Sequence, residues 1–245
     1  MLKEGERLDD LQNGLYLIQD PDLFCFGIDA VLLAHFPVIR KNDRVLDMGT
    51  GSGVIPLIMS TCSETNFIYA LEIQDVMASL ARRNVEYNGL QERISVIQGD
   101  IKEAAAYFEN ASFSLITCNP PYSGGNAGKA NENESVSIAR HEILVTLEQI
   151  IQSASYLLKN SGRFCMIHRP SRIPEIFELL KKYHLEPKRM RLVQPSWEKP
   201  ANLVLVEAVK GGKPYMITEP TLVVHREDGS YTDEVLRIYG RRERN

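Results

Sequence analysis

Strand-like and helical segments alternate along most of this chain, and this alternation limits the fold more than any other feature of the sequence. Short apolar runs typical of buried strands are separated by stretches with helical periodicity. Such an order favours a mainly parallel sheet with helices on both faces. We expect strands at 44–48, 67–72, 93–98, 113–118 and 162–168, and two final strands at 189–195 and 202–210 that could form an antiparallel pair.

Helical patterns occupy the intervals between the expected strands. In the segment 74–89, Val76, Leu80 and Val85 share one stripe, which predicts the buried face of a helix. The other expected helices cover 53–62, 101–108, roughly 138–159, 175–184 and 231–240.

Composition indicates an ordinary folded protein, with 44% hydrophobic and 24% charged residues. Because the net charge is -4, binding to nucleic acid would have to rest on local basic patches. The four cysteines are widely spaced, and we interpret them as reduced core residues without a disulfide framework or zinc site. The polar first ten residues do not resemble a signal peptide, and no apolar run approaches the ~18 residues of a membrane span. We therefore expect a cytoplasmic protein with no metal and no membrane partner.

A glycine-rich turn follows the first expected strand. Its glycines allow a tight turn and a close approach of a ligand to the backbone. The turn also opens a helix, whose first N–H groups are free to bind a polar ligand. The spacing is DxGxGxG rather than the dinucleotide pattern GxGxxG, and its residues are Asp47, Gly49, Gly51 and Gly53.

Two further acids end the second and third expected strands. Glu72 could accept hydrogen bonds from both hydroxyls of a ribose, and Asp100 ends the next strand. Alone, Glu72 could be a surface acid and Asp100 a helix cap. Together with Asp47 they would lie at the carboxyl edge of one parallel sheet, where open α/β sheets bind ligands.

At these residues the region 44–168 resembles the class I S-adenosylmethionine-dependent methyltransferases. The resemblance implies a Rossmann-like α/β fold with a mostly parallel seven-stranded sheet, helices on both faces and an antiparallel C-terminal edge. It also implies S-adenosyl-L-methionine as cofactor. The turn at 49–53 would hold the methionine part, Glu72 the ribose and Asp100 the adenine amino group. The implied cofactor set is Asp47, Gly49, Gly51, Gly53, Glu72 and Asp100.

The stretch Asn119-Pro120-Pro121-Tyr122 follows the fourth expected strand. The prolines restrict the backbone, so the Asn119 side-chain oxygen and a nearby carbonyl point in fixed directions. Two such acceptors can bind one amino group and stabilise the charge that develops as it attacks a methyl group, at ~3–4 kcal/mol each. Tyr122 offers a flat face for a planar substrate. The alternative is a structural Pro-Pro turn with an Asn cap and a core Tyr.

This motif resembles that of methyltransferases acting on adenine N6, cytosine N4, guanine N2 or protein glutamine, which implies that residues 119–122 are catalytic. Flanking segments resemble a bacterial family that methylates adenine N6 in valine tRNA, beside the anticodon. They lie at 24–36, 139–142, 168–170, 201–212 and 231–240. By that resemblance the substrate is a tRNA. Phe26 and Asp29 could help to close the cofactor site, or could belong to a helix that only packs on the sheet.

Three alternatives stay open. A protein glutamine methyltransferase of release-factor type usually carries a helical domain ahead of the glycine turn, whereas only about 45 residues precede it here. A ribosomal RNA guanine-N2 enzyme more often resembles NPPF or NPPW and tends to be longer. The third is a non-catalytic module that binds cofactor or RNA, and the intact motif and acids argue against it.

We expect one methyltransferase domain over 1–245, with a lead-in helix region at 1–43, a catalytic core at 44–210 and an appendage at 211–245. A monomer is favoured. Most basic residues, Arg169 among them, are expected to be solvated surface charges, and the segment 188–191 and the terminal Arg241 and Arg242 are the best candidates for phosphate contact. Trp197 could stack on a base or anchor its loop. The predicted substrate contacts are Arg140, His141, Lys188, Arg189 and Arg191.

Overall fold

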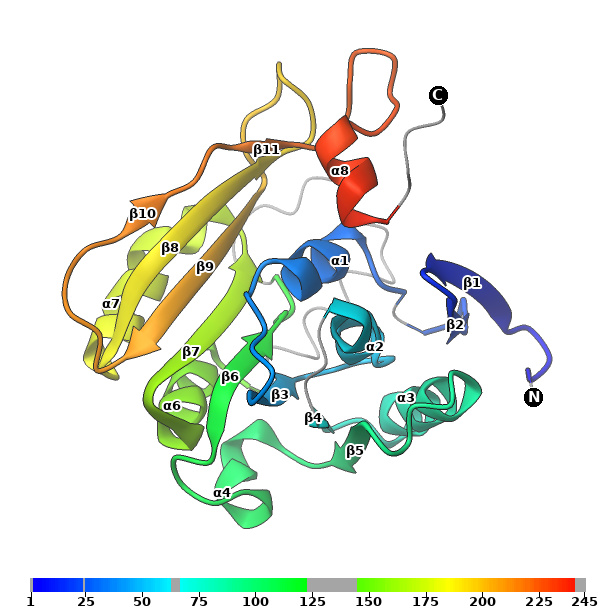
Figure 1. Cartoon of the computed structure of the whole chain (residues 1–245), viewed down its shortest axis with the longest axis horizontal. Coiled ribbons are helices and arrows are strands. Elements are labelled where there is room, and N and C mark those ends of the chain that lie inside the picture. Colours follow the sequence, from blue (N-terminus) through cyan, green and yellow to red (C-terminus); the bar gives the residue numbers. More distant parts are fainter. Residues whose placement is uncertain (1, 24, 63–66, 123–144, 241–245) are drawn as a thin grey trace.

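The fold is built around one mostly parallel sheet with helices on both faces (Figure 1). A computed structural model describes residues 2–23, 25–62, 67–122 and 145–240. Within these ranges the sheet has nine strands. In spatial order they are β10 (Ile217–Thr218), β8 (Leu185–Gln194), β9 (Leu203–Lys210), β7 (Leu158–His168), β6 (Phe113–Cys118), β3 (Arg44–Met48), β4 (Phe67–Glu72) and β5 (Ile94–Gln98), and β11 (Leu222–Val223) also pairs with β8.

The register of the parallel strands brings their carboxyl ends to one edge of the sheet. Met48 at the end of β3 lies opposite Leu71 of β4 and Cys118 of β6. The segments that follow these three strands therefore start close together. All seven expected strands are present, and β9 runs antiparallel to both β7 and β8, so the predicted fold class is confirmed. The two-residue strands β10 and β11, which pair in parallel with β8, were not expected.

Helices cover both faces of the sheet because successive apolar side chains along each strand point to opposite faces, and both faces must be buried. On β3, Val45 belongs to one buried cluster, whereas Leu46 and Met48 belong to the cluster on the other face. Cys118 and Cys165 are buried in these clusters with free thiols. None of the described helices is long and apolar enough to span a bilayer. One face carries α1 (Ile28–His35), α2 (Val54–Cys62) and α3 (Asp75–Tyr87), and the other carries α4 (Ala104–Tyr107), α6 (Leu147–Leu157) and α7 (Ile173–Lys182).

A β-hairpin precedes α1, formed by β1 (Arg7–Gln12) and β2 (Leu15–Gln19). Neither strand is among the expected elements, since only a helix was predicted in the lead-in region. Asn13 and Gly14 at the turn have φ angles of 54° and 79°. Two consecutive positive φ angles are typical of the tight hairpin turns that Asn-Gly favours.

A buried asparagine of α3 joins this hairpin to the glycine turn. The Asn84 side chain is fully buried, and its Oδ1 accepts the N–H of Ile18 at 2.6 Å. Its Nδ2 donates to the carbonyls of Ile18 at 3.1 Å and Ser52 at 3.0 Å. One helical turn later, Asn88 makes the same pair of bonds to the backbone of Tyr16, at 2.9 and 2.7 Å. The hairpin is therefore fixed by backbone hydrogen bonds to the helix that supports the turn.

In place of the helix expected at 138–159, the described residues contain the shorter helix α6, Leu147–Leu157. Its first residue follows Thr146, whose hydroxyl accepts the Gln149 N–H while the Gln149 side chain accepts the Thr146 N–H, at 3.3 and 2.8 Å. This reciprocal pair is a strong N-terminal stop signal. At Leu158 the backbone becomes extended and continues as β7, because poor helix formers follow. Residues 138–144 lie outside the described residues.

The helix expected in the appendage is α8 (Asp233–Ile238), which packs against α1.

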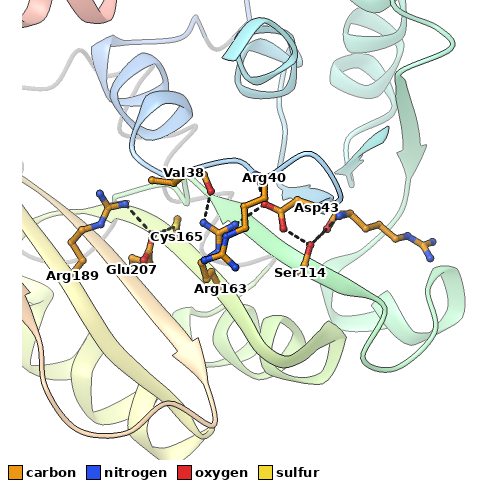
Figure 2. Close-up of polar contacts among 9 residues, drawn as sticks. Val38, Arg40, Asp43, Ser114, Arg163, Cys165, Arg189 and Glu207 are labelled. Atoms are coloured by element: carbon orange, nitrogen blue, oxygen red, sulfur yellow. Dashed lines mark hydrogen bonds and ion pairs between the residues drawn. The ribbon is translucent and has the colours of Figure 1, made fainter. Parts of the chain in front are cut away.

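At the sheet edge opposite the glycine turn, a buried ion pair holds the connection between α1 and β3 (Figure 2). Arg163 of β7 donates to Asp43 Oδ2 at 2.6 Å and to the carbonyl of Val38. Asp43 also accepts the backbone N–H of Arg40 at 2.7 Å and the Ser114 hydroxyl at 2.8 Å.

Replacing Asp43 by Asn should destabilise the fold, because the buried guanidinium of Arg163 would lose its counter-charge. We expect the free energy of unfolding in urea to fall by about 3–5 kcal/mol. The matched control is Asp233→Asn, which breaks the exposed pair between Arg226 and Asp233 and should cost less than about 1 kcal/mol. Equal losses in the two variants would contradict a special role for the buried pair.

Candidate active site

A cavity lies at the carboxyl edge of the sheet, where the ends of β3, β4 and β6 meet α1. Its wall combines the glycine turn, the residues after β4, the Asn-Pro-Pro-Tyr segment and the first residues of α1 and α6. Of the predicted cofactor residues, Asp47 and Gly53 lie behind the wall. The predicted residues that line the cavity are Gly49, Gly51, Glu72, Asp100 and all of 119–122.

The glycine turn is pinned to the neighbouring strand and packed against α3. The N–H groups of Gly49 and Thr50 both donate to the Leu71 carbonyl, at 2.8 and 3.0 Å. Gly53 has a φ angle of 85°, and a Cβ there would lie 3.3 Å from the Cβ of Ala81. Positive φ and close helix packing together require glycine at this position.

Glu72 closes the turn from the end of β4. One carboxylate oxygen accepts the N–H of Gly51 at 2.9 Å, and the other accepts the N–H of Gln74 at 2.9 Å. The residue is only 5% exposed but reaches the cavity wall. Because each carboxylate oxygen has a second lone pair, Glu72 can still accept hydrogen bonds from a ligand.

Asp47 has a different environment from the other two acids. It is completely buried, and its Oδ1 accepts the Thr117 hydroxyl at 2.7 Å. Its Oδ2 has no hydrogen-bond partner among the described residues. Burial raises the pKa of Asp47 from 3.8 to about 6, the Thr117 bond opposes this rise, and the charge of Glu72 adds to it. Asp47 therefore lies inside the core, bonded to β6, and not in the cavity wall.

Asp100 and Thr50 supply further polar atoms at the wall. Asp100 caps a short 3-10 helix (Ile101–Glu103), accepting the Lys102 N–H at 2.9 Å, and it also pairs with the Lys102 amine at 3.2 Å. The Thr50 hydroxyl is buried without a partner in the described part of the chain. Over the same residues, no group of three or more His, Cys, Asp or Glu side chains could hold a metal ion.

Asn119 and Tyr122 meet a third side chain, Asp29 of α1. The Nδ2 of Asn119 donates to Asp29 Oδ2 at 3.1 Å. The Tyr122 hydroxyl lies 2.7 Å from the same carboxylate oxygen and 2.7 Å from Asn119 Oδ1. A phenol has one proton, so it donates to one of these oxygens at a time. The sequence indicates Asp29 only as a residue that could close the cofactor site, whereas the structure brings it into hydrogen-bond contact with Asn119 and Tyr122.

The ring of Tyr122 contacts two side chains that are neighbours in the chain, His168 at the end of β7 and Arg169. His168 makes an edge contact with a centroid separation of 5.5 Å, and the Arg169 guanidinium lies 5.0 Å from the ring centre. Burial and the nearby charge of Asp29 raise the pKa of Tyr122 well above its ordinary value, so the phenol stays protonated. Burial also lowers the pKa of His168 to about 4, so its ring is neutral near neutral pH.

The predicted basic contacts lie elsewhere. Arg189 of β8 pairs with Glu207 at 2.9 Å and Glu219 at 3.0 Å (Figure 2 shows the first pair). Arg191 pairs with Glu234 at 2.7 Å, and the Lys188 amine donates to two backbone carbonyls. None of these three lines the cavity. Their contact with RNA stays a prediction, and the predicted contacts Arg140 and His141 lie outside the described residues.

The family model described as the methyltransferase small domain matches residues 16–184. Two curated relatives share the name tRNA1(Val) (adenine(37)-N6)-methyltransferase. The one from Photorhabdus laumondii is 31% identical over 214 residues, covering 86% of this chain and 85% of the relative. The one from Erwinia tasmaniensis is 34% identical over 184 residues, covering 74% and 73%.

A solved structure supports the fold alone. It is described as a predicted O-methyltransferase from Agrobacterium tumefaciens, and it superposes with a TM-score of 0.71 at 22% identity. The match covers 86% of this chain and 95% of that one.

The raised pKa of Asp47 predicts a pH-dependent cost to stability. Below about pH 3 the carboxyl is protonated in both folded and unfolded chains, and the cost is absent. As pH rises through about 4 to 6, the unfolded chain ionises first, so the folded state loses stability relative to an Asp47→Asn variant. Between about pH 4 and pH 7 the variant should gain roughly 2 kcal/mol over wild type in urea unfolding. A constant difference over this range would show that Asp47 titrates normally in the folded protein.

Proposed function

Since this chain belongs to the methyltransferase small domain family and to the family of tRNA1(Val) (adenine(37)-N6)-methyltransferases, we propose that it methylates N6 of an adenine in the anticodon loop of a tRNA. The observation that carries the proposal is the cluster of Asp29, Asn119 and Tyr122 at the cavity that Glu72 and Asp100 also line. The names of the relatives support the choice of adenine and of tRNA. From this substrate we infer a cytoplasmic location.

S-adenosyl-L-methionine fits the polar groups of the wall. Glu72 keeps free lone pairs that can accept hydrogen bonds from the ribose hydroxyls. The carboxylate of Asp100 can accept a hydrogen bond from the adenine amino group. When bound, this cofactor supplies a methyl group on a positively charged sulfur, and an amine can attack the carbon of that methyl group.

Asp29 determines which end of the Asn119 amide meets the substrate. A carboxylate can only accept hydrogen bonds, so the Nδ2 of Asn119 turns toward Asp29 and Oδ1 is left for other donors. Tyr122 occupies at most one of the two lone pairs of Oδ1, and the second can accept an N–H of the substrate amine. The negative charge of Asp29 also polarises the amide, which makes Oδ1 a stronger acceptor for the substrate amine.

The function is tested by tritiated methyl transfer to purified tRNA, release factor and duplex DNA in parallel, followed by digestion to locate the label. We expect label on N6-methyladenine from tRNA and little in the other two substrates. An anticodon-loop adenine is already unpaired, so presenting it costs less than extruding a base from a duplex. Label on glutamine or on guanine N2 would contradict the adenine assignment and leave amino-group methylation standing.

A set of substitutions separates chemistry from binding. Asn119→Ala should lower kcat by ~100-fold or more and leave cofactor affinity nearly unchanged in calorimetry, because it removes one preorganised acceptor. Asp29→Asn should lower kcat by roughly tenfold, because its amide no longer dictates the orientation of the Asn119 amide. Tyr122→Phe keeps the ring and should cost less than Asn119→Ala.

The double variant of Asp29 and Asn119 is the control for this assignment. If Asp29 acts through the Asn119 amide, adding Asp29→Asn to Asn119→Ala should cause no further loss of kcat. Independent losses that multiply would rule out this route, and full turnover in Asn119→Ala would remove the motif from the mechanism.

A further inference from the structure

The loop between β8 and β9, residues 195–202, holds the single tryptophan of the chain in water. Trp197 is 72% exposed, so it does not anchor the loop on the core. Most tryptophans are highly buried on average, because their large apolar area favours burial. An indole left in solvent in this way is available for a partner.

The exposure of Trp197 is not a consequence of a loosely attached loop. His225 holds the Pro195 carbonyl through its backbone N–H at 3.0 Å and its ring at 3.1 Å. The Gln194 side chain donates to the Lys199 carbonyl at 3.0 Å. The loop thus presents the indole from a defined backbone, which lowers the ordering cost of stacking on it.

The loop stands at the same sheet edge as the active site. β8 runs parallel to β7 and β6, so its carboxyl end, where the loop begins, lies at the edge where Asn119 follows β6 (Figure 1). Arg169 connects the two places. Its guanidinium lies 5.0 Å from the centre of the Tyr122 ring, and its Nη1 donates to the Asn202 carbonyl at 3.3 Å.

The chemistry of this surface suits single-stranded nucleic acid. An exposed aromatic ring stacks on any base, and nearby cations neutralise phosphates. Arg169 and Lys199 are two of the cations at this edge, and Glu198 is the acid within the 195–202 segment. The arginines of β8, in contrast, are already engaged by glutamates.

We propose that the 195–202 loop is part of the RNA-binding surface and that Trp197 stacks on an unpaired base next to the one that enters the active site. The proposal deepens the proposed function and rests on it, because it names how an unpaired RNA loop is held. Arg169 links the end of the loop, at Asn202, to the Tyr122 ring.

Because the chain has one tryptophan, its fluorescence reports on Trp197 alone. The full chain, without methyl donor, is titrated with an anticodon stem-loop RNA and with a blunt duplex of the same stem. We expect saturable quenching with the stem-loop and much less with the duplex. Saturating stem-loop binding, seen by filter retention, with unchanged emission would overturn the proposal. It would leave the proposed function intact, because methyl transfer to tRNA is assayed separately.

Trp197→Ala should raise the KM for tRNA roughly tenfold to hundredfold, with kcat and cofactor affinity unchanged. Trp197→Phe should recover much of this loss, because stacking needs only a ring. The matched control is Tyr156→Ala. Tyr156 of α6 is 43% exposed, and its carbonyl accepts hydrogen bonds from Asn110 and Ala111, which precede β6 at the edge opposite the active site, so loss of its ring should leave KM unchanged.

Equal KM values for Trp197→Ala and wild type would overturn the assignment. So would a change in sedimentation of the protein alone on Trp197→Ala, because the indole would then serve contact between copies of the chain. Absence of methyl transfer to tRNA by the wild-type protein would instead contradict the proposed function, whatever the fluorescence shows.

Discussion

The geometry of the active site depends on the buried ion pair between Arg163 and Asp43, which lies at the opposite edge of the sheet. Arg163 also binds the Val38 carbonyl just after α1, and Asp43 directly precedes β3, so the pair fixes both ends of the connection between them (Figure 2). With that connection held, α1 keeps a fixed position over the sheet. This position carries Asp29 to the Asn119 amide, 90 residues later in the chain.

The charged side chains at the cavity differ in sign from the one beside it, where Arg169 lies over Tyr122. Glu72 and Asp100 line the cavity and Asp29 stands at its motif, so acceptors dominate there. Acceptors suit hydroxyl and amino groups and a cationic sulfur, but they repel phosphate. An RNA substrate must therefore be held beside the cavity rather than by it. The Arg169 side chain, which covers one face of Tyr122, marks the boundary between the two regions.

Local patterns in the sequence predict the strands well, because each strand of a covered parallel sheet must be apolar whatever lies beside it. The wrong predictions concern the buried face of α3 and the region before α1, where a local pattern fits more than one structure. Val76 fits a helical stripe but is 58% exposed, and the buried face of α3 instead carries Met77, Leu80 and Ala81. The dipeptide Asn13-Gly14 is typical of a tight hairpin turn, but only a helix is predicted from the sequence of this region.

The glycine turn, the order of strands and helices and the Asn-Pro-Pro-Tyr motif can be predicted from the sequence, because each depends on residues that are neighbours in the chain. The position of Asp47 behind the cavity wall, the hydrogen bond between Asn119 and Asp29 and the exposure of Trp197 appear only in the folded chain. Periodicity indicates whether a side chain leaves the solvent, but it does not indicate which distant side chain it meets. That choice follows from the order of the strands in the sheet and from the connection that fixes α1 above them.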